Sequence, residues 1–470
     1  MFDQPQSMKI AVIGAGVAGL GAAWLLSRRH EVVVYERESR FGGHSCTVDV
    51  PGDVAGIGSA KFRTQPVDVG FIVFNNCNYP NLVALFEHLG VPTENSDMSF
   101  AVSLNGGRYE YGSAHRSYLA QRRNLVRPSF LRMSRDILRF NRLAPQLLGK
   151  AENLDFTIGD FVKDAGLSGA FRDRYLIPMA SCIWSTPAAR MLDYPAQSFA
   201  RFFDNHGLLS TGPQLQWRTV SGGSRTYVER IAAPLRARAR LAMPARSIHR
   251  CINGVMVRDA AGQWDRFDKI VLACHADQAL ALLSDADARE RDLLGRFAYS
   301  TNEVWLHGDE TLMPHRRAVW SSWNYVSESG TVEQPVSVTY WMNRLQNLGS
   351  APPTFVSVNP ARSPLPALAH ARFAFEHPVY DAAAIRAQRH LHELQGIRDT
   401  YFCGSYCGYG FHEDALSAGL DVAEQLGVRR PWRRPDEHRR IGDPPRVVTE
   451  CPSSSLLPLP AAARVAMETP

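Results

Sequence analysis

The chain has 470 residues, of which 45% are hydrophobic and 21% are charged, a composition typical of a globular protein that excludes a wholly disordered chain. This length is large for a single hydrophobic core and predicts two interleaved domains. The formal net charge of +6 rests mainly on arginine, and a basic face would favour anionic partners such as phospholipid head groups. We expect no nucleic-acid partner and no bound metal.

The cellular location is suggested by what the sequence lacks. The eight cysteines are scattered, with no CxxC pair, which fits a reducing cytoplasm. The chain reaches a strand-like run by Lys9 without a charged leader and an apolar segment, so we expect no signal peptide. No stretch approaches roughly 18 uninterrupted apolar residues, which predicts no membrane-spanning helix. Contact with the surface of the inner membrane stays open.

The most informative stretch near the N-terminus is "KIAVIGAGVAGLGAAWLL". Lys9 to Ile13 is typical of a buried parallel strand, and residues 17–28 are typical of a helix. Gly14, Gly16 and Gly19 have the spacing that supplies a tight turn, close approach to a pyrophosphate and close helix packing. The start of the helix would point its amides at phosphates.

A second strand and an acidic residue follow this loop. Residues 31–35 read as the strand, and Glu36 falls roughly twenty residues beyond the first glycine, where an acid binds a ribose hydroxyl. Strand, loop, helix, strand and acid together predict a Rossmann-like dinucleotide-binding unit. The pattern alone does not separate NAD(P) from FAD.

Small residues around this unit favour FAD. Gly21 and Ala22 extend the small-residue run into the helix, and Arg40, Gly42 and Gly43 follow the acid closely. This arrangement resembles the flavoprotein family of amine oxidases and phytoene-type desaturases, in which a glycine pair after the second strand contacts the FAD diphosphate. The alternative for "RFGGH" is an ordinary turn.

The C-terminal segment "YFCGSYCGYGFHEDALSAG" completes the resemblance. In the family such a segment returns to the first domain as a strand (here residues 401–403), a glycine turn (Gly404) and a helix (residues 414–426). The helix start would face the pyrimidine end of the flavin. Ser405 stands where the family usually carries an acid. The fingerprint and the resemblance together assign these residues to the cofactor: Gly14, Gly16, Ala18, Gly19, Glu36, Arg37, Gly42, Gly43, His44, Ala245, Gly404, Ser405, Glu413, Asp414 and Ala415.

The resemblance predicts an α/β fold, in which a Rossmann-like FAD-binding domain of the amine oxidase/phytoene desaturase type carries an inserted α+β substrate domain. Residues 8–78, 221–290 and 390–428 would form the FAD-binding domain. Residues 79–220, helical in period, and 291–389, with alternating strands, would form the substrate domain. The segment 429–470 loses periodicity, and we expect it to be disordered.

Two features of the inserts have alternative interpretations. Trp305, Trp320, Trp323 and Trp341 would form either core or an apolar pocket wall above the flavin. The basic, amphipathic region 115–148 would be either a solvated charged face or a lipid-binding one.

The chain most resembles bacterial predicted NAD/FAD-binding, amine-oxidase-like proteins. The stretches that carry the resemblance are "DVGFIVFNNCNYPNLVALFEHLGV", "IPMASCIWSTP", "QWRTVSGGS", "VTYWMNRLQNL" and "GYGFHEDALSAG". That family is also similar to the oxidase-like N-terminal part of plant cyclopropane fatty acid synthases, and its bacterial members tend to be encoded beside cyclopropane-synthase-like methyltransferases. The resemblance implies a lipid acyl substrate and a methyltransferase partner.

One departure bears on the reaction. Amine oxidases generally hold a lysine near flavin N5, and Asn302 stands about where that lysine would fall. We therefore expect an FAD-dependent oxidoreductase that dehydrogenates or isomerises an unsaturated, methylated or cyclopropane acyl chain by hydride transfer to flavin N5. An amine or amino acid oxidase and a non-catalytic FAD-containing partner of a lipid methyltransferase remain alternatives.

The run His412, Glu413 and Asp414 contains the candidate catalytic residues, because it precedes the helix expected to end at the flavin. The alternative is that Asp414 caps the helix while His412 and Glu413 pack against or hydrogen-bond the turn.

Overall fold

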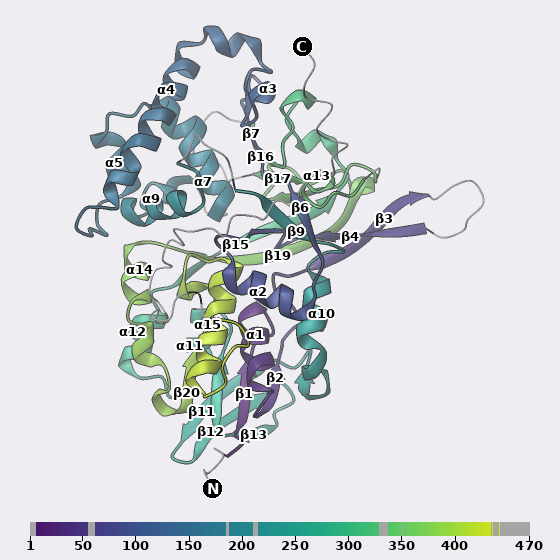
Figure 1. Ribbon diagram of the computed structural model, residues 1–470, viewed down its shortest axis with the longest axis vertical. Coiled ribbons are helices and arrows are strands. Elements are labelled where there is room, and N and C mark those ends of the chain that lie inside the picture. Colours follow the sequence, from purple (N-terminus) through teal and green to yellow (C-terminus); the bar gives the residue numbers. More distant parts are fainter. Residues whose placement is uncertain are drawn as a thin grey trace, which may run out of the picture.

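The computed structural model describes residues 6–54, 62–184, 188–209, 215–328, 337–349, 351–433, 435 and 441. Within these ranges no helix combines the length and the apolar character needed to cross a bilayer. The two expected parts of the fold follow one another along the long axis: a parallel sheet lies toward one end, and a larger, mainly antiparallel sheet extends from the middle toward the other (Figure 1).

A five-stranded parallel sheet brings together segments that are distant in sequence. Its order is β10 (Ala239–Arg240), β2 (Glu31–Tyr35), β1 (Lys9–Ile13), β14 (Lys269–Leu272) and β20 (Thr400–Phe402). β1 lies in the middle, where its last four residues are buried. The N-terminal, middle and C-terminal segments expected to form the FAD-binding domain thus share one sheet, and β10 is a short edge strand that the sequence did not predict.

Helices α1 (Val17–Leu26) and α15 (His412–Gln425) lie side by side against this sheet (Figure 1). All ten residues of α1 are buried, since the helix is enclosed by the sheet and α15. A Cβ atom at Gly419 would come 2.1 Å from the Ala18 carbonyl oxygen, and one at Gly21 would come 2.7 Å from Leu416. Gly419 and Gly21 therefore permit the close packing of the two helices.

Further elements complete this part of the chain. A three-stranded antiparallel sheet of β11 (Ala245–Cys251), β12 (Gly254–Asp259) and β13 (Trp264–Phe267) contacts the parallel strands. The further helices of this part are α2 (Pro80–Leu89), α10 (Arg225–Ala232), α11 (Ala276–Leu282), α12 (Ala288–Leu294) and α14 (Ala382–Gln388). α2 and α14 lie within segments expected in the substrate domain, but their buried side chains join the core around the parallel sheet.

The second part is built on a seven-stranded sheet. Its order is β19 (Ala369–Val379), β15 (Ala298–His307), β18 (Phe355–Val358), β17 (Val338–Trp341), β16 (Trp323–Ser327), β7 (Phe100–Leu104) and β8 (Tyr109–Gly112). β7 and β8 belong to the first insert, which is therefore not wholly helical. Their burial on both faces removes the alternation that would have marked them as strands.

Helices from the first insert form a separate layer beyond this sheet (Figure 1). The longer ones are α4 (Pro128–Leu143), α5 (Ile158–Asp164), α7 (Ile177–Trp184) and α9 (Ala196–Asn205). They enclose an aromatic core in which Phe140, Phe171, Phe199 and Phe203 are fully buried. The short helices are α3 (His115–Tyr118), α6 (Gly169–Phe171), α8 (Ala188–Met191) and α13 (Met342–Leu345). A π-helical segment covers Arg172–Leu176. Short 3₁₀ segments lie at Arg122–Val126, Ala144–Leu147, Ala233–Arg238, Glu310–Leu312, Arg317–Val319, Pro366–Leu368, Leu391–Leu394, Ile397–Asp399 and Ser405–Cys407.

Two small β elements join the parts. β5 (Val73–Asn75), β9 (Trp217–Val220) and β6 (Thr93–Ser96) form a three-stranded sheet, and β3 (Thr47–Val54) pairs with β4 (Phe62–Asp68) as a projecting hairpin (Figure 1). Asp68, at the base of the hairpin, accepts hydrogen bonds from the Ser224 amide at 2.9 Å and from Gln346 at 2.9 Å. This carboxylate ties the hairpin to both parts.

The start of the expected disordered tail is packed against the fold. Arg430 is buried and forms ion pairs with Asp421 at 2.5 Å and Glu424 at 2.7 Å, and the Trp432 ring stacks on Trp24. Ile441 is also buried. Disorder from residue 429 is therefore the wrong expectation for these residues, because their side chains find partners on α1 and α15; most of the predicted tail lies outside the described residues.

The tryptophans of the second insert divide between environments. Trp320 packs with Met313, Phe355 and Trp341 in a small cluster of its own, as the core interpretation expects. Trp323 contacts Tyr340 edge-on with ring centroids 5.2 Å apart, also inside the sheet layer. Trp305 lies under the Arg372 guanidinium. These three environments favour core packing over a shared pocket wall.

Candidate functional site

The glycine loop between β1 and α1 has the geometry of a phosphate-binding turn. Gly14 has a φ of 104°, a left-handed conformation, and a Cβ atom there would lie 2.7 Å from the Ala273 carbonyl oxygen. A Cβ atom at Gly19 would meet the Gly14 carbonyl oxygen at 1.9 Å, so this glycine permits close helix packing. At Gly16, by contrast, a Cβ atom would have no neighbour within 4 Å. The loop is therefore tight at both ends and open in the middle.

The glycine pair after β2 lies directly on this loop. The Gly42 amide donates to the Ala15 carbonyl oxygen at 2.8 Å, and a Cβ atom at Gly43 would come 3.1 Å from the Gly16 Cα atom. Arg40 donates to the Gly43 carbonyl oxygen at 2.8 Å and holds the turn. The pair thus packs on the open loop and extends it. An ordinary turn would not need these contacts with the loop.

Glu36 is buried beneath the loop at the end of β2. One carboxylate oxygen accepts from the Ala15 amide at 2.7 Å and the other from the Glu38 amide at 2.9 Å. Besides its predicted place beside a ribose, this carboxylate therefore orients the loop. The neighbouring Arg37 side chain is 61% exposed and reaches only toward Glu38.

The segment that precedes Ala245 runs beside Glu36. The Met243 amide donates to the Glu36 carbonyl oxygen at 2.9 Å, and the Ala242 amide donates to the Glu38 carbonyl oxygen at 2.8 Å. Ala245 itself is buried at the start of β11. The structure thus brings the segment before Ala245 to the side of the loop that carries Glu36.

His44, which follows the glycine pair, is a partly exposed imidazole whose Nε2 atom is buried and free. Its Nε2 atom has no hydrogen-bond partner among the described residues. The ring bonds the Glu376 carbonyl, so Nδ1 carries the proton and donates it to that oxygen. Burial lowers the pKa of His44 well below its usual value, and three neighbouring imidazoles lower it further. His44 is therefore neutral, with the Nε2 lone pair unused.

Beside His44 lies a hydrogen-bonded group that the sequence did not reveal. The His377 ring on β19 lies 5.2 Å from the His44 ring. Its Nδ1 atom accepts from Asn302 Nδ2 at 2.9 Å, and Asn302 Oδ1 accepts from Asn359 at 2.7 Å. Burial lowers the pKa of His377 to about 4. Asn302, expected in place of a lysine, is thus part of a neutral polar chain, whose partners are brought together by the pairing of β15 with β19 and with β18.

The C-terminal turn is closely packed around its own side chains. Ser405 lies in this turn, and its carbonyl oxygen accepts a hydrogen bond from the Tyr380 hydroxyl at 3.1 Å. Cys403 and Cys407 are both buried, and burial raises the pKa of the Cys403 thiol well above its usual value. A buried thiol of raised pKa is a poor nucleophile, which favours a packing role for Cys403.

The three candidate catalytic residues each have structural partners. Asp414 Oδ2 accepts from the amides of Tyr409 and Phe411, both at 3.0 Å, and caps α15. Glu413 accepts from the amides of Asn81 and Leu82, both at 2.9 Å, at the start of α2. The geometry of both acids favours the capping alternative, and Ala415 is buried in the same turn.

His412 is held differently. Its ring stacks on Phe71 with centroids 3.9 Å apart, and Nε2 lies 2.8 Å from the Ser45 hydroxyl. Burial lowers the pKa of His412 to about 3, so the imidazole is neutral. Its Nε2 atom is thus occupied by the Ser45 and Tyr227 hydroxyls, and the ring packs against Phe71.

A family model described as flavin containing amine oxidoreductase matches residues 17–359, which begin at helix α1 and include the glycine pair and most of both inserts. The chain belongs to the flavin-containing amine oxidoreductase family. FAD is therefore its cofactor, and the chain is a flavin-dependent oxidoreductase.

Comparison with individual proteins agrees with this membership. A Mycobacterium tuberculosis protein provisionally named flavin-containing monoamine oxidase AofH is 28% identical over 273 residues, which are 56% of this chain and 56% of that one. The chain thus matches little more than half the length of this curated relative.

Solved structures show the same fold. The chain is similar to cyclohexylamine oxidase from Brevibacterium oxydans (TM-score 0.65, 15% identity, 90% of this chain and 100% of that one). It is also similar to putrescine oxidase bound to putrescine (TM-score 0.62, 15% identity, 90% and 100%) and to a CLA-producing fatty acid isomerase from P. acnes (TM-score 0.59, 16% identity, 90% and 99%). At these identities the likeness shows the fold alone.

The flavoprotein site of this chain fits FAD at the glycine loop, because the space in front of Gly16 leaves room for a pyrophosphate. The unpartnered Nε2 of His44 is a buried acceptor on the residue that follows the glycine pair. Gly14, Ala18 and Gly19 shape the loop, and Glu36 supports it from below. These residues would hold the cofactor.

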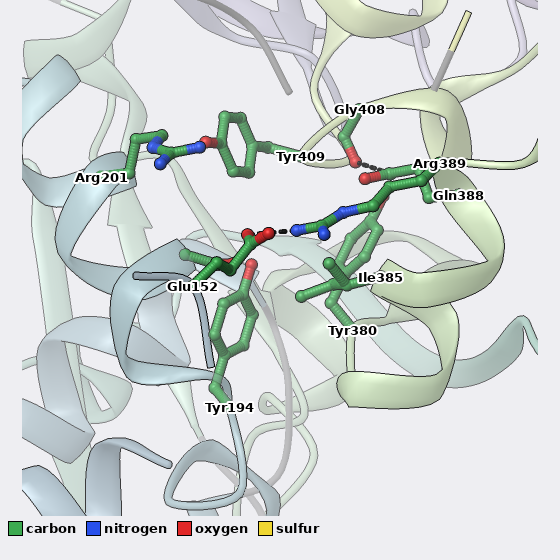
Figure 2. A pocket seen from close by; sticks show the side chains of 10 residues that line it. Glu152, Tyr194, Arg201, Tyr380, Ile385, Gln388, Arg389, Gly408 and Tyr409 are labelled. Atoms are coloured by element: carbon green, nitrogen blue, oxygen red, sulfur yellow. Dashed lines mark hydrogen bonds and ion pairs between the residues drawn. The ribbon is translucent and has the colours of Figure 1, made fainter. Parts of the chain in front are cut away.

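A separate cleft lies between the helical layer and the segment that leads to α15. Figure 2 shows Arg201 of α9 pointing toward the Tyr409 ring, with Glu152 and Arg389 paired below them. Gln388 donates to the carbonyl oxygen of Gly408 at 2.6 Å and closes one wall. The cleft therefore ends against the turn that caps α15.

Proposed function

We propose that this flavoprotein dehydrogenates or isomerises a lipid acyl chain, with FAD as the hydride acceptor. The observation that carries the proposal is the neutral polar group of His44, His377 and Asn302 beside the glycine pair. Amine oxidases generally place a lysine in this region, and this chain has an amide and imidazoles there instead. An uncharged acyl chain suits such surroundings.

The carboxylates near this group support the same conclusion. Glu413 and Asp414 are occupied by backbone amides, and Glu376 lies 3.4 Å from the His275 ring. A cationic amine would need a carboxylate or another strong acceptor to offset its desolvation. These three carboxylates already have partners, so they favour a neutral substrate over a cation.

We assign the proton to His44, on the geometry of its free Nε2 atom. Forming a C=C bond removes a hydride from one carbon and a proton from its neighbour. FAD, when bound, takes the hydride. The Nε2 lone pair of His44 is free for the proton, and the Glu376 carbonyl fixes the tautomer through Nδ1. In isomerisation the same two groups would return hydride and proton at different carbons.

An amine oxidase is the second candidate. It is favoured by the description of the family and by the names of AofH, cyclohexylamine oxidase and putrescine oxidase. The fatty acid isomerase has the same fold, so the fold itself does not choose between these reactions.

The test is to mix the FAD-loaded protein with each candidate substrate without oxygen and to measure flavin reduction as the loss of the flavin absorbance bands. Vesicles whose phospholipids carry monounsaturated, methylated or cyclopropane chains should bleach the flavin, or their acyl chains should change in double-bond position. A panel of amines and amino acids should leave the flavin oxidised. Lipid analysis of a deletion strain should show altered acyl chains. Bleaching by an amine, with peroxide release in air and unchanged lipids, would reverse the assignment.

A non-catalytic role beside a lipid methyltransferase predicts a third result. The flavin would stay oxidised with every substrate, while the protein would co-purify with the methyltransferase. We propose a cytoplasmic location for either lipid-linked role.

A further inference from the structure

The surface formed by the exposed side chains of residues 116–142, here called the α3–α4 surface, carries apolar residues in contact with solvent. Leu119, Leu125, Val126, Leu131 and Leu138 are 37, 48, 81, 53 and 62% exposed. They are half of the ten large hydrophobic side chains that are exposed in the described parts of the chain, although they come from a short stretch. Scattered single exposed residues are ordinary, but a gathering of this kind marks a contact surface.

Helix α4 shows how these residues are arranged. Its inner face is anchored by Phe130, Met133 and Phe140, which are buried. Leu131, Arg135, Leu138 and Arg142 are exposed at positions i, i+4, i+7 and i+11, which fall on one face of a helix. The outward face therefore alternates leucine with arginine, in place of the uniformly polar face of a solvated helix.

The charge of the α3–α4 surface is almost wholly positive. Arg116, Arg122, Arg132, Arg135 and Arg142 are exposed, and none of them has a carboxylate within 4 Å among the described residues. The only acid between residues 113 and 150 is Asp136, which is buried and paired with Arg139 at 3.0 Å. The surface thus presents unpaired guanidinium groups around exposed leucines.

This surface lies away from the cofactor-binding sheet. Figure 1 shows α3 and α4 in the upper part of the molecule, beyond the seven-stranded sheet, with β1 and β2 at the opposite end. A large partner could therefore cover the α3–α4 surface without touching the glycine loop.

We propose that the α3–α4 surface docks the protein on an anionic phospholipid bilayer. Guanidinium groups bind lipid phosphates through paired hydrogen bonds, and the leucines and the valine between them fit the boundary between head groups and acyl chains. Nucleic acid would match the charge, but it offers no hydrocarbon for Val126, Leu131 and Leu138. The occupant that satisfies both the charge and the exposed apolar area is a membrane.

The test is to sediment the FAD-loaded protein with vesicles and to measure the bound protein by the flavin absorbance of the pellet. Vesicles of phosphatidylcholine with a minor fraction of phosphatidylglycerol should carry the protein down, pure phosphatidylcholine should carry much less, and added salt should release it. Arg132→Gln with Arg135→Gln should lower partitioning roughly thirtyfold, at the usual contribution of basic residues near an anionic surface. Val126→Ser with Leu138→Ser should lower binding while leaving the net charge unchanged.

Matched controls lie elsewhere on the surface. Arg236→Gln with Arg238→Gln removes the same charge from an exposed turn beside α10, and Ile252→Ser removes an exposed apolar side chain from the β11–β12 turn. Both should sediment like the unchanged protein. The proposal fails if the protein does not sediment with anionic vesicles, if the controls weaken binding as much as the α3–α4 variants, or if the two serine substitutions have no effect. Vesicle binding needs no turnover, so its failure would leave the proposed reaction untouched.

Discussion

The two ends of the chain differ in how they use glycine at the cofactor site. Around Gly16 the space that a side chain would fill is open. Around Gly408 a Cβ atom would lie 2.1 Å from Asp414 Oδ1, because the turn is filled by its own carboxylate. The first region is shaped to receive a ligand and the second to start a helix.

This difference shows which residues of a motif contact a ligand and which hold the fold. Asp414 and Glu413 satisfy the amides at the starts of α15 and α2, so they fix the helices that enclose the site. Ionisable residues next to a helix start therefore have a structural use that must be examined before a catalytic one is assigned.

The largest effect should come from closing the contact between α1 and α15. Gly419→Ala places a methyl group against the Ala18 carbonyl oxygen, where 2.1 Å is available, and the helices must separate. We expect a loss of about 3 kcal/mol in the free energy of unfolding, measured by urea titration. Gly149→Ala is the control, since its Cβ atom would have no neighbour within 4 Å. Equal stability of the two variants would show that the helix contact is not tight.

At the open end of the comparison, Gly16→Val should abolish FAD binding without unfolding the protein. The side chain would enter the space left for the pyrophosphate, while the apoprotein loses no contact. Far-ultraviolet circular dichroism should match that of the unchanged apoprotein, and flavin absorbance should be absent after reconstitution. Gly149→Val should bind FAD normally, and a yellow Gly16→Val protein would place the cofactor elsewhere.

His44→Phe tests the free imidazole nitrogen. The phenyl ring can keep the contact with Phe375, at 4.9 Å in the present structure, but it accepts no proton. Reduction of bound flavin by the acyl substrate should slow by roughly 10²- to 10⁴-fold. His249→Phe, at an exposed site on β11, should reduce at the usual rate. If His44→Phe loses FAD but the residual holoprotein reduces normally, His44 only binds the cofactor.

The smallest effect concerns Glu413. Burial raises its pKa from 4.5 to about 7, so the folded protein binds a proton that the unfolded chain releases. This group therefore lowers the free energy of unfolding as the pH rises from about 4.5 to about 7. Glu413→Gln lacks this pH dependence. It also loses part of the cap on α2, which costs about 1 kcal/mol in the free energy of unfolding.

Unfolding midpoints at several pH values check this prediction. The difference in stability between the unchanged protein and Glu413→Gln should narrow over that pH range, whereas Glu87→Gln, on the exposed side of α2, should give a constant difference. A normal flavin content and reduction rate in Glu413→Gln would agree with the capping role. A holoprotein whose flavin no longer reduces would instead make Glu413 catalytic.

Local sequence patterns were enough to predict the first two strands around the cofactor. The strands at Lys9–Ile13 and Glu31–Tyr35 were predicted with their observed bounds, because a short continuous apolar run next to a glycine loop is a strong local signal. The discontinuous sheet followed from the family resemblance.

Contacts between distant segments could not be predicted in the same way. His377 and Asn302 meet only through the pairing of β15 with β19, and Glu413 reaches the amides of α2 across the fold. The helix start at His412 and the packed Arg430 likewise depend on partners supplied by tertiary structure. No local pattern marks such pairs.

Hydrogen exchange with and without FAD tests the comparison between the two ends most directly. The account predicts that FAD slows exchange at the amides of residues 16–19 and 43–44, which lie at the open loop and the glycine pair. The amides of Tyr409 and Phe411, already bonded to Asp414, should exchange slowly in both states. Protection by FAD concentrated at residues 409–411, with none at the glycine loop, would contradict the account.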